Sequence, residues 1–558
     1  MTNPPVLNRS ISTRVLVVGG GPVGLVLAMC LARQGVEVVV AESRRRGEPP
    51  SVKCNHVSAR SMEIFRQLGI ASAIRNCGLP ADFSNDVAYR TTTTGPELAR
   101  IPIPCRRDRY TDKSGPDGWW PTPEPPHRVN QLFMEPVLAE CAAAMAGLRI
   151  VNRLQVLDCV QDEHGVVASA QDLDTGRHVR IDCEVLIGCD GAKSLVRKKI
   201  GAALAGDDCI GRTQSTFIRA PELLSLLKHP PAWATFSINP RRCGNVYAID
   251  GKERWLVHNY LLRDEAGFDA VDRDHAIRKI LGVGPGFRYE VLAKEDWFAR
   301  RLVADRLRDR RIFICGDAAH IWVPMAGYGM NAGIADAANL AWQLSAHLNG
   351  WAPPGILDAH ERERLPITEQ ASRFAMSHAL ALQARREAVH EDIEREGPHG
   401  DAARAATGRA LYELNVQQYC CAGLNFGYFY ADSPIIAYDN ESAPEYTMAQ
   451  YTASTVPGCR TPHLWLRDGR SLYDAAATSG YVLLRFDPAV DARPLLDAAR
   501  RRGLPLQLLD VDAPDASSIY RHALVMSRPD QHVAWRGQAA PADALHLIDR
   551  LRGAFAES

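Results

Sequence analysis

Apolar and polar positions follow one another along the chain in patterns that predict strands and helices. A strand-like apolar run covers 14–18, glycines occupy 19–21, and an apolar helix-like stretch continues to about residue 34. A second apolar run covers 36–41. Strand, glycine turn, helix and strand in this order predict a βαβ unit, which belongs to a parallel sheet covered on both faces.

The pattern changes in the next part of the chain. Residues 90–126 are rich in Thr, Pro, Gly and Arg and predict an irregular excursion, after which 130–145 favours a helix. Alternating segments at 154–171 and 178–187 predict an antiparallel meander. Short strand patterns then dominate 213–294, which predicts a second, mostly β unit.

The last part of the chain returns to helix. Residues 300–348 read as strand, turn and helix, and 357–420 are largely helical, with Arg, Glu and Ala dominating. After Pro457, strands and helices alternate again over 481–535. This alternation predicts a separate small α/β domain at the end of the sequence.

Composition narrows the class of protein without pointing to one. A chain of 558 residues is long enough for two to four structural units. Its 65 basic and 65 acidic residues cancel, so neither nucleic acid nor an anionic membrane is expected as a partner. Residues 1–13 are polar and no apolar run reaches about 18 residues, so we expect a cytoplasmic protein without a signal peptide or membrane span.

The 14 cysteines are scattered and contain no CxxC pair. Zinc and disulfide frameworks are therefore disfavoured, and we expect free thiols in a reducing compartment and no metal. The adjacent pair Cys420 and Cys421 is interpreted as packing, because cysteine is among the residue types most often buried.

The residues at 19–24, GGGPVG, fit the G-x-G-x-x-G pattern of a dinucleotide-binding turn. Gly19 allows the tight turn, Gly21 lets a pyrophosphate approach the backbone, and Gly24 lets the helix pack on the strand. Glu42 ends the second strand about 20 residues on, where an acid accepts hydrogen bonds from ribose hydroxyls. An acid favours a free 2′-hydroxyl over a 2′-phosphate, so the turn suits FAD or NAD better than NADP.

Two further turns place an aspartate where a buried strand ends. Asp190 follows the apolar run 185–187, and Asp317 follows 312–314. Ligands of parallel sheets lie outside the carboxyl ends of strands, where an aspartate can accept hydrogen bonds from a polyol chain. The second turn leads into the apolar helix predicted at 332–348, whose N-terminus would favour negative charge such as that of a reduced flavin.

These three segments, in this order, resemble the single-component FAD-dependent aromatic hydroxylases, the class A flavoprotein monooxygenases of the para-hydroxybenzoate hydroxylase and phenol hydroxylase type. GCDGAKSLVR at 188–197 resembles their DG motif, and GDAAHIWVPMAGYGMN at 316–331 resembles their GD motif. RVNQ at 128–131 is similar to the segment whose glutamine contacts FAD. The tail resembles the thioredoxin-like domain of the phenol hydroxylase branch; its single cysteine, Cys459, rules out dithiol exchange there, so a dimerising or capping role is expected.

The resemblance implies FAD bound tightly and without a covalent link. NADH or NADPH would bind only transiently, since the chain has no second fingerprint. The residues implied to contact FAD are Gly19, Gly21, Pro22, Val23, Gly24, Glu42, Arg44, Gln131, Asp190, Asp317, Pro324, Gly327, Gly329, Met330 and Asn331.

The resemblance also implies an α/β fold of discontinuous domains and a homodimer. The expected parts are a Rossmann-like FAD-binding domain of the para-hydroxybenzoate hydroxylase type from 1–85, 127–212 and 295–375, an interleaved β substrate domain from 86–126 and 213–294, a helical connection at 376–455, and a thioredoxin-like domain without CxxC at 456–558.

The implied reaction uses NAD(P)H and O2 to hydroxylate a phenolic or related aromatic substrate through a C4a-hydroperoxyflavin, as in aromatic compound catabolism. His56 is the candidate base for the phenol, since imidazole titrates near neutral pH; the alternative is a structural histidine. In phenol hydroxylase-like enzymes an aspartate of this loop is the base, and the aligned position here is Asn55. Candidate pocket residues on the predicted β unit are Phe217, Arg219, Phe236, Tyr247 and His258, each of which could also be core or surface.

Two alternatives stay open from the sequence. One keeps the fold but changes the reaction to epoxidation or Baeyer–Villiger oxidation of a polycyclic metabolite. The other is a flavin-binding interaction protein without turnover. The aromatic substrate, the ring position and the choice of NADH or NADPH stay open as well.

Overall fold

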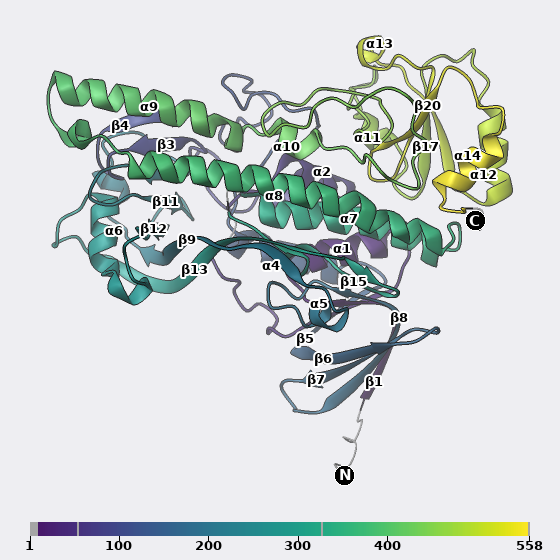
Figure 1. The fold of residues 1–558 in the computed structure, drawn as a ribbon, viewed down its shortest axis with the longest axis horizontal. Helices are drawn as coiled ribbons and strands as arrows, with labels where there is room; N and C mark the ends of the chain where they lie inside the picture. Colours follow the sequence, from purple (N-terminus) through teal and green to yellow (C-terminus); the bar gives the residue numbers. More distant parts are fainter. Residues whose placement is uncertain (1–8, 53–54, 325–326, 556–558) are drawn as a thin grey trace.

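The computed structural model describes residues 9–52, 55–324 and 327–555. Most strands of the two large sheets lie below the long helices in Figure 1, and the C-terminal domain lies toward one end of these helices. The predicted mixed α/β architecture is confirmed. None of the helices in the described ranges is long and apolar enough to cross a membrane.

The first sheet contains the predicted βαβ unit at its centre and has the strand order β14-β15-β8-β1-β2-β5. The hairpin of β6 and β7 extends it through antiparallel pairing of β7 with β8. The central strands of this sheet are parallel. Their apolar side chains are buried on both faces of the sheet, as the continuous apolar runs in the sequence predicted. The strands are β1 (Arg9–Val18), β2 (Val38–Glu42), β5 (Leu148–Asn152), β6 (Leu154–Gln161), β7 (Val166–Asp172), β8 (His178–Gly188), β14 (Arg308–Asp309) and β15 (Ile312–Ile314).

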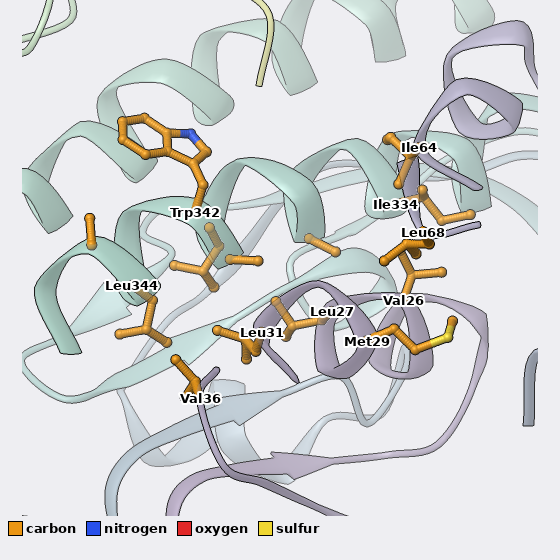
Figure 2. Packing of buried hydrophobic residues seen from close by; sticks show 14 of the residues in the cluster. Val26, Leu27, Met29, Leu31, Val36, Ile64, Leu68, Ile334, Trp342 and Leu344 are labelled. Carbon is orange, nitrogen blue, oxygen red and sulfur yellow. The ribbon is translucent and has the colours of Figure 1, made fainter. Parts of the chain in front are cut away.

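Helix α1 (Pro22–Arg33) packs against the long helix α7 (Tyr328–Leu348). Figure 2 shows Leu27 and Leu31 of α1 lying beneath α7 in this apolar layer. Both side chains are completely buried, and replacing such a leucine by alanine typically costs roughly 2–5 kcal/mol. The layer therefore fixes the starting points of both helices relative to the sheet.

The second sheet has the order β16-β13-β9-β12-β11-β10-β3-β4 and forms the predicted β unit. Its two longest strands, β9 (Leu204–Arg219) and β13 (Glu290–Ala304), pair along most of their length and link the two sheets. The expected domain limits at 212 and 294 fall inside these strands, so the division stays a prediction. The other strands are β3 (Val87–Arg90), β4 (Glu97–Ile101), β10 (Ala234–Ser237), β11 (Gly244–Ala248), β12 (Arg254–Tyr260) and β16 (His320–Ile321).

Part of the predicted irregular excursion at 90–126 is ordered as strand. Strand β4 lies within it and pairs with β3 at the edge of the second sheet. Helix α9 (Pro398–Tyr419) covers this edge, and a Cβ at Gly408 would lie 2.0 Å from the carbonyl oxygen of Leu98. The sequence of the excursion gave no sign of this pairing, because the strand is held by its neighbours rather than by an apolar pattern.

Long helix α8 (Asp358–Glu387) runs from the first sheet across the second and ends near α9 (Figure 1). The helical prediction for 357–420 is confirmed by α8 and α9. The remaining helices of the two-sheet body are α2 (Ala59–Gln67), α3 (Ala71–Arg75), α4 (Gln131–Ala143), α5 (Leu195–Lys199), α6 (Arg273–Leu281) and α10 (Ala422–Phe426).

The C-terminal domain is a four-stranded sheet with the order β18-β17-β19-β20. The predicted strand, helix, strand and hairpin are all present. Its elements are α11 (Leu472–Ala475), β17 (Tyr481–Arg485), α12 (Arg493–Arg502), β18 (Leu506–Asp510), α13 (Ala516–Ile519), β19 (Leu524–Ser527), β20 (Val533–Gly537) and α14 (Ala544–Leu551).

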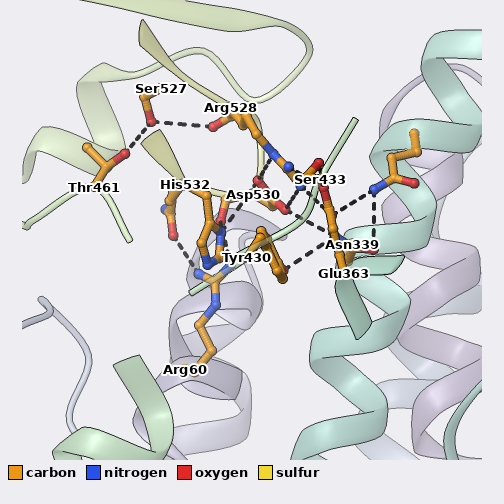
Figure 3. A network of polar contacts seen from close by, with 12 residues as sticks. Arg60, Asn339, Glu363, Tyr430, Ser433, Thr461, Ser527, Arg528, Asp530 and His532 are labelled. Carbon is orange, nitrogen blue, oxygen red and sulfur yellow. Dashed lines mark hydrogen bonds and ion pairs between the residues drawn. The ribbon is translucent and has the colours of Figure 1, made fainter. Parts of the chain in front are cut away.

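Buried charges hold the C-terminal domain against the two-sheet body (Figure 3). Arg528 pairs with Glu363 of α8 at 2.8 Å and with Asp530 at 2.7 Å. Asn339 of α7 donates to Glu363 at 2.7 Å, and Arg60 of α2 donates to the backbone oxygen of Asp530 at 3.0 Å. We call the charged members of this network the latch: Arg60, Glu63, Glu363, Arg460, Arg528 and Asp530.

Candidate active site

The three turns singled out in the sequence lie side by side at the carboxyl ends of β1, β8 and β15. Val18 pairs with Gly188, and Gly188 pairs with Ile314, so the three strands end level with one another. The turns are also in close contact: a Cβ on Gly19 (φ +105°) would lie 2.3 Å from the carbonyl oxygen of Cys189. The predicted convergence of the three segments is confirmed.

The N-terminus of α1 is open toward this edge of the sheet. Gly21 is its N-cap residue, no described side chain caps it, and its first turn carries no acidic residue. A Cβ on Gly21 would meet nothing within 4 Å, whereas one on Gly24 would lie 2.1 Å from the carbonyl oxygen of Gly19. Space and backbone N–H groups are thus available for an anionic pyrophosphate at Gly21, while Gly24 serves packing. This fits FAD.

The α7 N-terminus provides a second such position. Gly327 (φ +60°) is its N-cap residue, no capping side chain is found among the described residues, and its first turn has no acidic group. Pro324 before it is exposed, Gly329 and Met330 are half-buried, and residues 325–326 lie outside the described ranges. A helix start of this kind favours negative charge, as expected for the pyrimidine end of a flavin.

Glu42, at the end of β2, belongs to a chain of polar contacts. Its carboxylate accepts from Gly20 N at 2.7 Å and from Arg44 N at 2.8 Å. Burial would raise the pKa of Glu42, but hydrogen bonds from Arg44 and its charge bring that pKa below the ordinary value. Arg44 also pairs with Glu135 at 2.6 Å, and Gln131 donates to Glu135 at 2.7 Å. Glu135 therefore links three predicted FAD residues.

Sequence reasoning gave Glu135 no role. The signal was its position four residues after Gln131 on one helix, which places both side chains on the same face. An ionised Glu42 in this chain is an acceptor suited to a ribose hydroxyl.

The two motif aspartates differ in their surroundings. Asp190 binds the start of α5, accepting from Leu195 N at 2.7 Å and from the Ser194 hydroxyl at 2.5 Å. Asp317 lies in the short 3-10 turn Gly316–Ala318 and its side chain is exposed. Asp190 thus orders its own turn, whereas the side chain of Asp317 is exposed; FAD contact stays a prediction for both.

Asn331 connects the start of α7 to the loop that carries His56. Its side-chain oxygen accepts from Ser58 N at 2.8 Å and from the Ser61 hydroxyl at 2.7 Å, and its amide nitrogen donates to the carbonyl oxygen of His56 at 3.1 Å. Gly327 adds a close approach, because a Cβ there would lie 2.9 Å from the Cβ of His56. The GD motif and the His56 loop therefore form one rigid unit.

His56 is 4% exposed and its Nδ1 contacts the guanidinium of Arg128. Burial, reinforced by the charges of Arg128 and Arg109, lowers the pKa of His56 well below its ordinary value. The ring is therefore neutral at pH 7, and Nδ1, which faces a donor, is an acceptor. The expectation that this imidazole titrates near neutral pH does not match this environment, which makes His56 a weak base.

Candidate pocket residues of the second sheet share one face. Residues paired across neighbouring strands point to the same face of a sheet. Phe236 and His258 both pair with Asn245 of β11. Tyr247 and Phe217 both pair with Leu256 of β12, and Tyr247 lies two residues after Asn245, so all four share this face. The ring centroids of Tyr247 and His258 lie 5.7 Å apart. Four of the five predicted side chains thus form an aromatic surface.

The members of this surface differ in exposure. His258 shares a hydrogen bond with the Ser215 hydroxyl at 2.6 Å, and burial lowers its pKa to about 4. The fifth predicted residue, Arg219, is exposed and pairs with Glu253 at 2.9 Å. Arg219 therefore lies outside the aromatic surface, because it is the last residue of β9 and its side chain reaches solvent.

Arg128 joins the His56 loop to the aromatic surface. Its guanidinium carbon lies 4.6 Å from the ring centroid of Trp233 and 5.8 Å from that of Tyr419 on α9. Trp233 in turn lies 5.1 Å from Tyr247. The sequence did not identify Arg128, Trp233 or Tyr419, which come from three distant segments; only the place of Arg128 three residues before Gln131 offered a hint.

Comparison with known proteins gives a consistent result. Residues 12–375 match the family model of the FAD binding domain, and residues 454–557 match that of the aromatic-ring hydroxylase C-terminal domain. The FAD-dependent monooxygenase apdD of Emericella nidulans is 31% identical over 94% of this chain and 87% of its own. Phenol 2-monooxygenase of a Pseudomonas species is 28% identical over 99% and 94%.

Solved structures agree over the full length. The rebeccamycin biosynthetic enzyme RebC with reduced flavin superposes with a TM-score of 0.88 at 33% identity, covering 98% of this chain and all of that one. Aklavinone-11 hydroxylase, in a complex with FAD and aklavinone, gives a TM-score of 0.78 at 25% identity, covering 99% of both chains.

Proposed function

The chain belongs to the FAD-dependent monooxygenases of the aromatic-ring hydroxylase family, and from this premise we propose that it hydroxylates a phenolic ring with NAD(P)H as reductant and O2 as oxidant. The observation that carries the proposal is the aromatic surface of the second sheet, which Arg128 and His56 connect to the start of α7. Phe236, Tyr247 and Trp233 give a substrate ring buried apolar neighbours, with Phe236 stacked on Tyr89 and Trp233 tilted at 57° to Tyr247. Phenol 2-monooxygenase, similar over nearly the whole chain, supports a phenolic substrate.

FAD, when bound, supplies the hydride and oxygen chemistry of the reaction. The residues of this chain that would hold it are Gly21 and the following N–H groups at the pyrophosphate, Glu42 at a ribose hydroxyl, and the start of α7 at the flavin ring. Arg44 and Gln131 would keep Glu42 and Glu135 in place.

The protein's own contribution is position and exclusion of water. Asn331 fixes the His56 loop, and the buried aromatic side chains leave little room for water beside the substrate. Because Nδ1 of neutral His56 accepts from Arg128, its Nε2 carries the proton and can donate a hydrogen bond to a substrate oxygen. His56 would then orient the phenolic oxygen instead of removing its proton.

The test is substrate-stimulated oxidation of NADH and of NADPH by the FAD-loaded protein, with a panel of substituted phenols and salicylates and the mass of each product. A product one oxygen heavier with a new ring hydroxyl supports the proposal, and the faster reductant identifies the nicotinamide. Protein freed of FAD is the control and should show no stimulation. Tightly bound FAD without turnover of any ring would favour the non-catalytic alternative.

A second candidate reaction has one observation in its favour. Aklavinone-11 hydroxylase is similar over 99% of both chains, and its solved structure is a ternary complex with FAD and aklavinone. A lactone or an epoxide among the products would support oxidation of a polycyclic metabolite by Baeyer–Villiger chemistry or epoxidation.

A role in aromatic catabolism, a homodimer and a cytoplasmic location are further parts of the proposal. The C-terminal domain, which matches the family model of the aromatic-ring hydroxylase C-terminal domain over residues 454–557, is the part through which we expect two copies to associate. Light scattering of the purified protein, with the mass of 61.4 kDa per chain as the unit, tests the dimer. Fractionation of the source cells tests the location.

A further inference from the structure

Arg128 is a buried cation without a carboxylate partner. Arg128 is 3% exposed, and among the described residues its Nη2 has no hydrogen-bond partner. Across residues 9–52, 55–324 and 327–555, no ion pair joins Arg128 to an aspartate or glutamate. Burying a charge without a partner is strongly unfavourable, so such a group in a folded protein calls for an explanation.

The neighbours of Arg128 do not supply the missing charge. Asp117, the carboxylate that acts on it through space, is bound to Arg109 at 2.6 Å and also accepts from the indole N–H of Trp120 at 2.8 Å. Two guanidinium groups and one carboxylate leave this cluster with an excess of one positive charge.

The titratable groups around the cluster are neutral at pH 7. Burial lowers the pKa of both His56 and His127 well below the ordinary value. Burial also raises the pKa of Tyr419 and brings that of Cys421 to about 12. The excess positive charge is therefore not cancelled by ionisation of a neighbour.

The position of Arg128 identifies the partner it lacks. Its guanidinium rests on the ring of Trp233, next to Tyr247 on the aromatic surface, and its other contact is His56. A planar ring lying on that surface would bring a substituent within reach of the guanidinium. The negative end of a flavin has a different partner in the start of α7.

We propose that Arg128 is the receptor for an anionic oxygen on the aromatic substrate, a ring carboxylate or a phenolate. This inference rests on the proposed function and adds the class of substrate: an aromatic acid or an ionised phenol instead of a neutral ring. The ligand anion would bring the excess charge of the cluster to zero, and the two remaining N–H groups of the fork suit an oxygen anion.

The test measures binding, not turnover, on the full-length FAD-loaded protein. Flavin difference spectra are used to titrate salicylate and 3-hydroxy-2-naphthoate, each beside its neutral carboxamide. The wild-type protein should bind each acid at least about tenfold more tightly than its amide. Arg128→Gln should weaken the binding of the acids by roughly 100-fold and the binding of the amides by less than about threefold, since only the charge-assisted contact is lost.

Two further variants keep the result interpretable. Arg128→Lys retains the charge but not the planar fork, and should lie between the wild type and Arg128→Gln. Arg254→Gln removes an exposed arginine of the same sheet, 49% accessible, and should change neither acid nor amide binding. Flavin content and visible circular dichroism confirm that each variant is folded around FAD.

A separate titration distinguishes the two sources of the anion. 4-Nitrophenol reports its own ionisation by colour, so a phenolate site should make it ionise at lower pH when bound to the wild type, and Arg128→Gln should reverse that shift. A preference for the acids alone would assign a carboxylate.

The proposal would be overturned if Arg128→Gln weakened the binding of acids and amides equally. It would also be overturned if the wild-type protein bound no anionic probe more tightly than its neutral counterpart. Hydroxylation of neutral phenols could still be observed in that case, so the proposed function is judged independently.

Discussion

Two buried clusters of charge differ in how their charges are matched. The latch contains three arginines and three carboxylates, and each arginine has a carboxylate within ion-pair distance. The cluster of Arg109, Arg128 and Asp117 contains two arginines and one carboxylate, and within the described part of the chain only Arg109 has a carboxylate in ion-pair contact. The latch is complete by itself, whereas the active-site cluster needs a ligand.

This difference separates structural burial of charge from functional burial. Complete removal of a matched buried pair is often tolerated, but loss of one member leaves an isolated charge. The latch joins α2, α7 and α8 to the C-terminal domain, and α2 and α7 both begin at the active site. The matched cluster therefore holds in place the helices that position the unmatched one.

The largest effect is expected from Glu363→Gln in the latch. This change leaves the guanidinium of Arg528 with less counter-charge in a completely buried position, and should lower the free energy of unfolding by about 3–5 kcal/mol. Urea denaturation of the FAD-loaded protein measures it. The matched control is Arg362→Met, next along α8, which breaks an exposed pair with Asp432 and should cost less than about 0.5 kcal/mol.

A double replacement sharpens this prediction. Glu363→Leu combined with Arg528→Met removes both charges of the pair, and should cost clearly less than the sum of the two single changes. Additive effects would mean that the latch is an ordinary set of independent contacts and would remove the basis of the comparison.

Arg128→Gln should behave in the opposite way. Its anion affinity should fall by roughly 100-fold, about 2.7 kcal/mol, while the free energy of unfolding of the ligand-free protein changes by less than about 1 kcal/mol. The reason is that this substitution removes a buried charge that had no partner, whereas Glu363→Gln leaves a buried charge with less compensation. Thermal unfolding with and without salicylate measures both quantities. A loss of stability as large as that of Glu363→Gln would place Arg128 among the structural charges.

The glycines of the first turn offer the same contrast within one motif. Gly24→Ala should lower the free energy of unfolding by about 1–3 kcal/mol, because the added methyl group would lie 2.1 Å from a backbone oxygen. The methyl group added by Gly21→Ala would meet no described atom within 4 Å, so the stability of the FAD-free protein should not change. The same methyl group should weaken FAD binding at least about tenfold. Flavin fluorescence titration and urea denaturation separate the two; a destabilised Gly21→Ala protein would contradict the assignment of open space to the cofactor.

The turns where we propose that FAD binds could be found from the sequence, whereas the cluster where we propose that the substrate binds could not. Gly19, Gly21, Gly24 and Glu42 lie in one continuous βαβ unit, so local pattern and spacing carried the information. Arg128 and its aromatic neighbours come from segments more than a hundred residues apart, and only the place of Arg128 three residues before Gln131 offered a hint.

Burial was the other quantity that the sequence could not provide. Arg219 and Arg128 are equally plausible pocket residues by type, but one pairs with Glu253 in solvent and the other is enclosed. Likewise, the low pKa of His56 follows from enclosure beside two guanidinium groups, not from its neighbours in sequence.

The smallest expected effect concerns the pH dependence of His56. Because its folded-state pKa lies well below 6.5 and the unfolded chain takes up a proton near 6.5, its contribution to stability is present above about pH 6.5 and is lost as the pH falls toward the folded-state pKa. His56→Gln cannot bind that proton, so the variant's unfolding free energy should fall less steeply below pH 6.5, by at most about 1.4 kcal/mol per pH unit. The variant should also lower kcat by roughly tenfold through lost orientation while leaving the shape of the pH–rate profile unchanged. Should the wild-type profile instead contain a limb near pH 6.5 that disappears in His56→Gln, the imidazole is the base after all, and the active-site cluster must hold enough negative charge to restore its ordinary pKa.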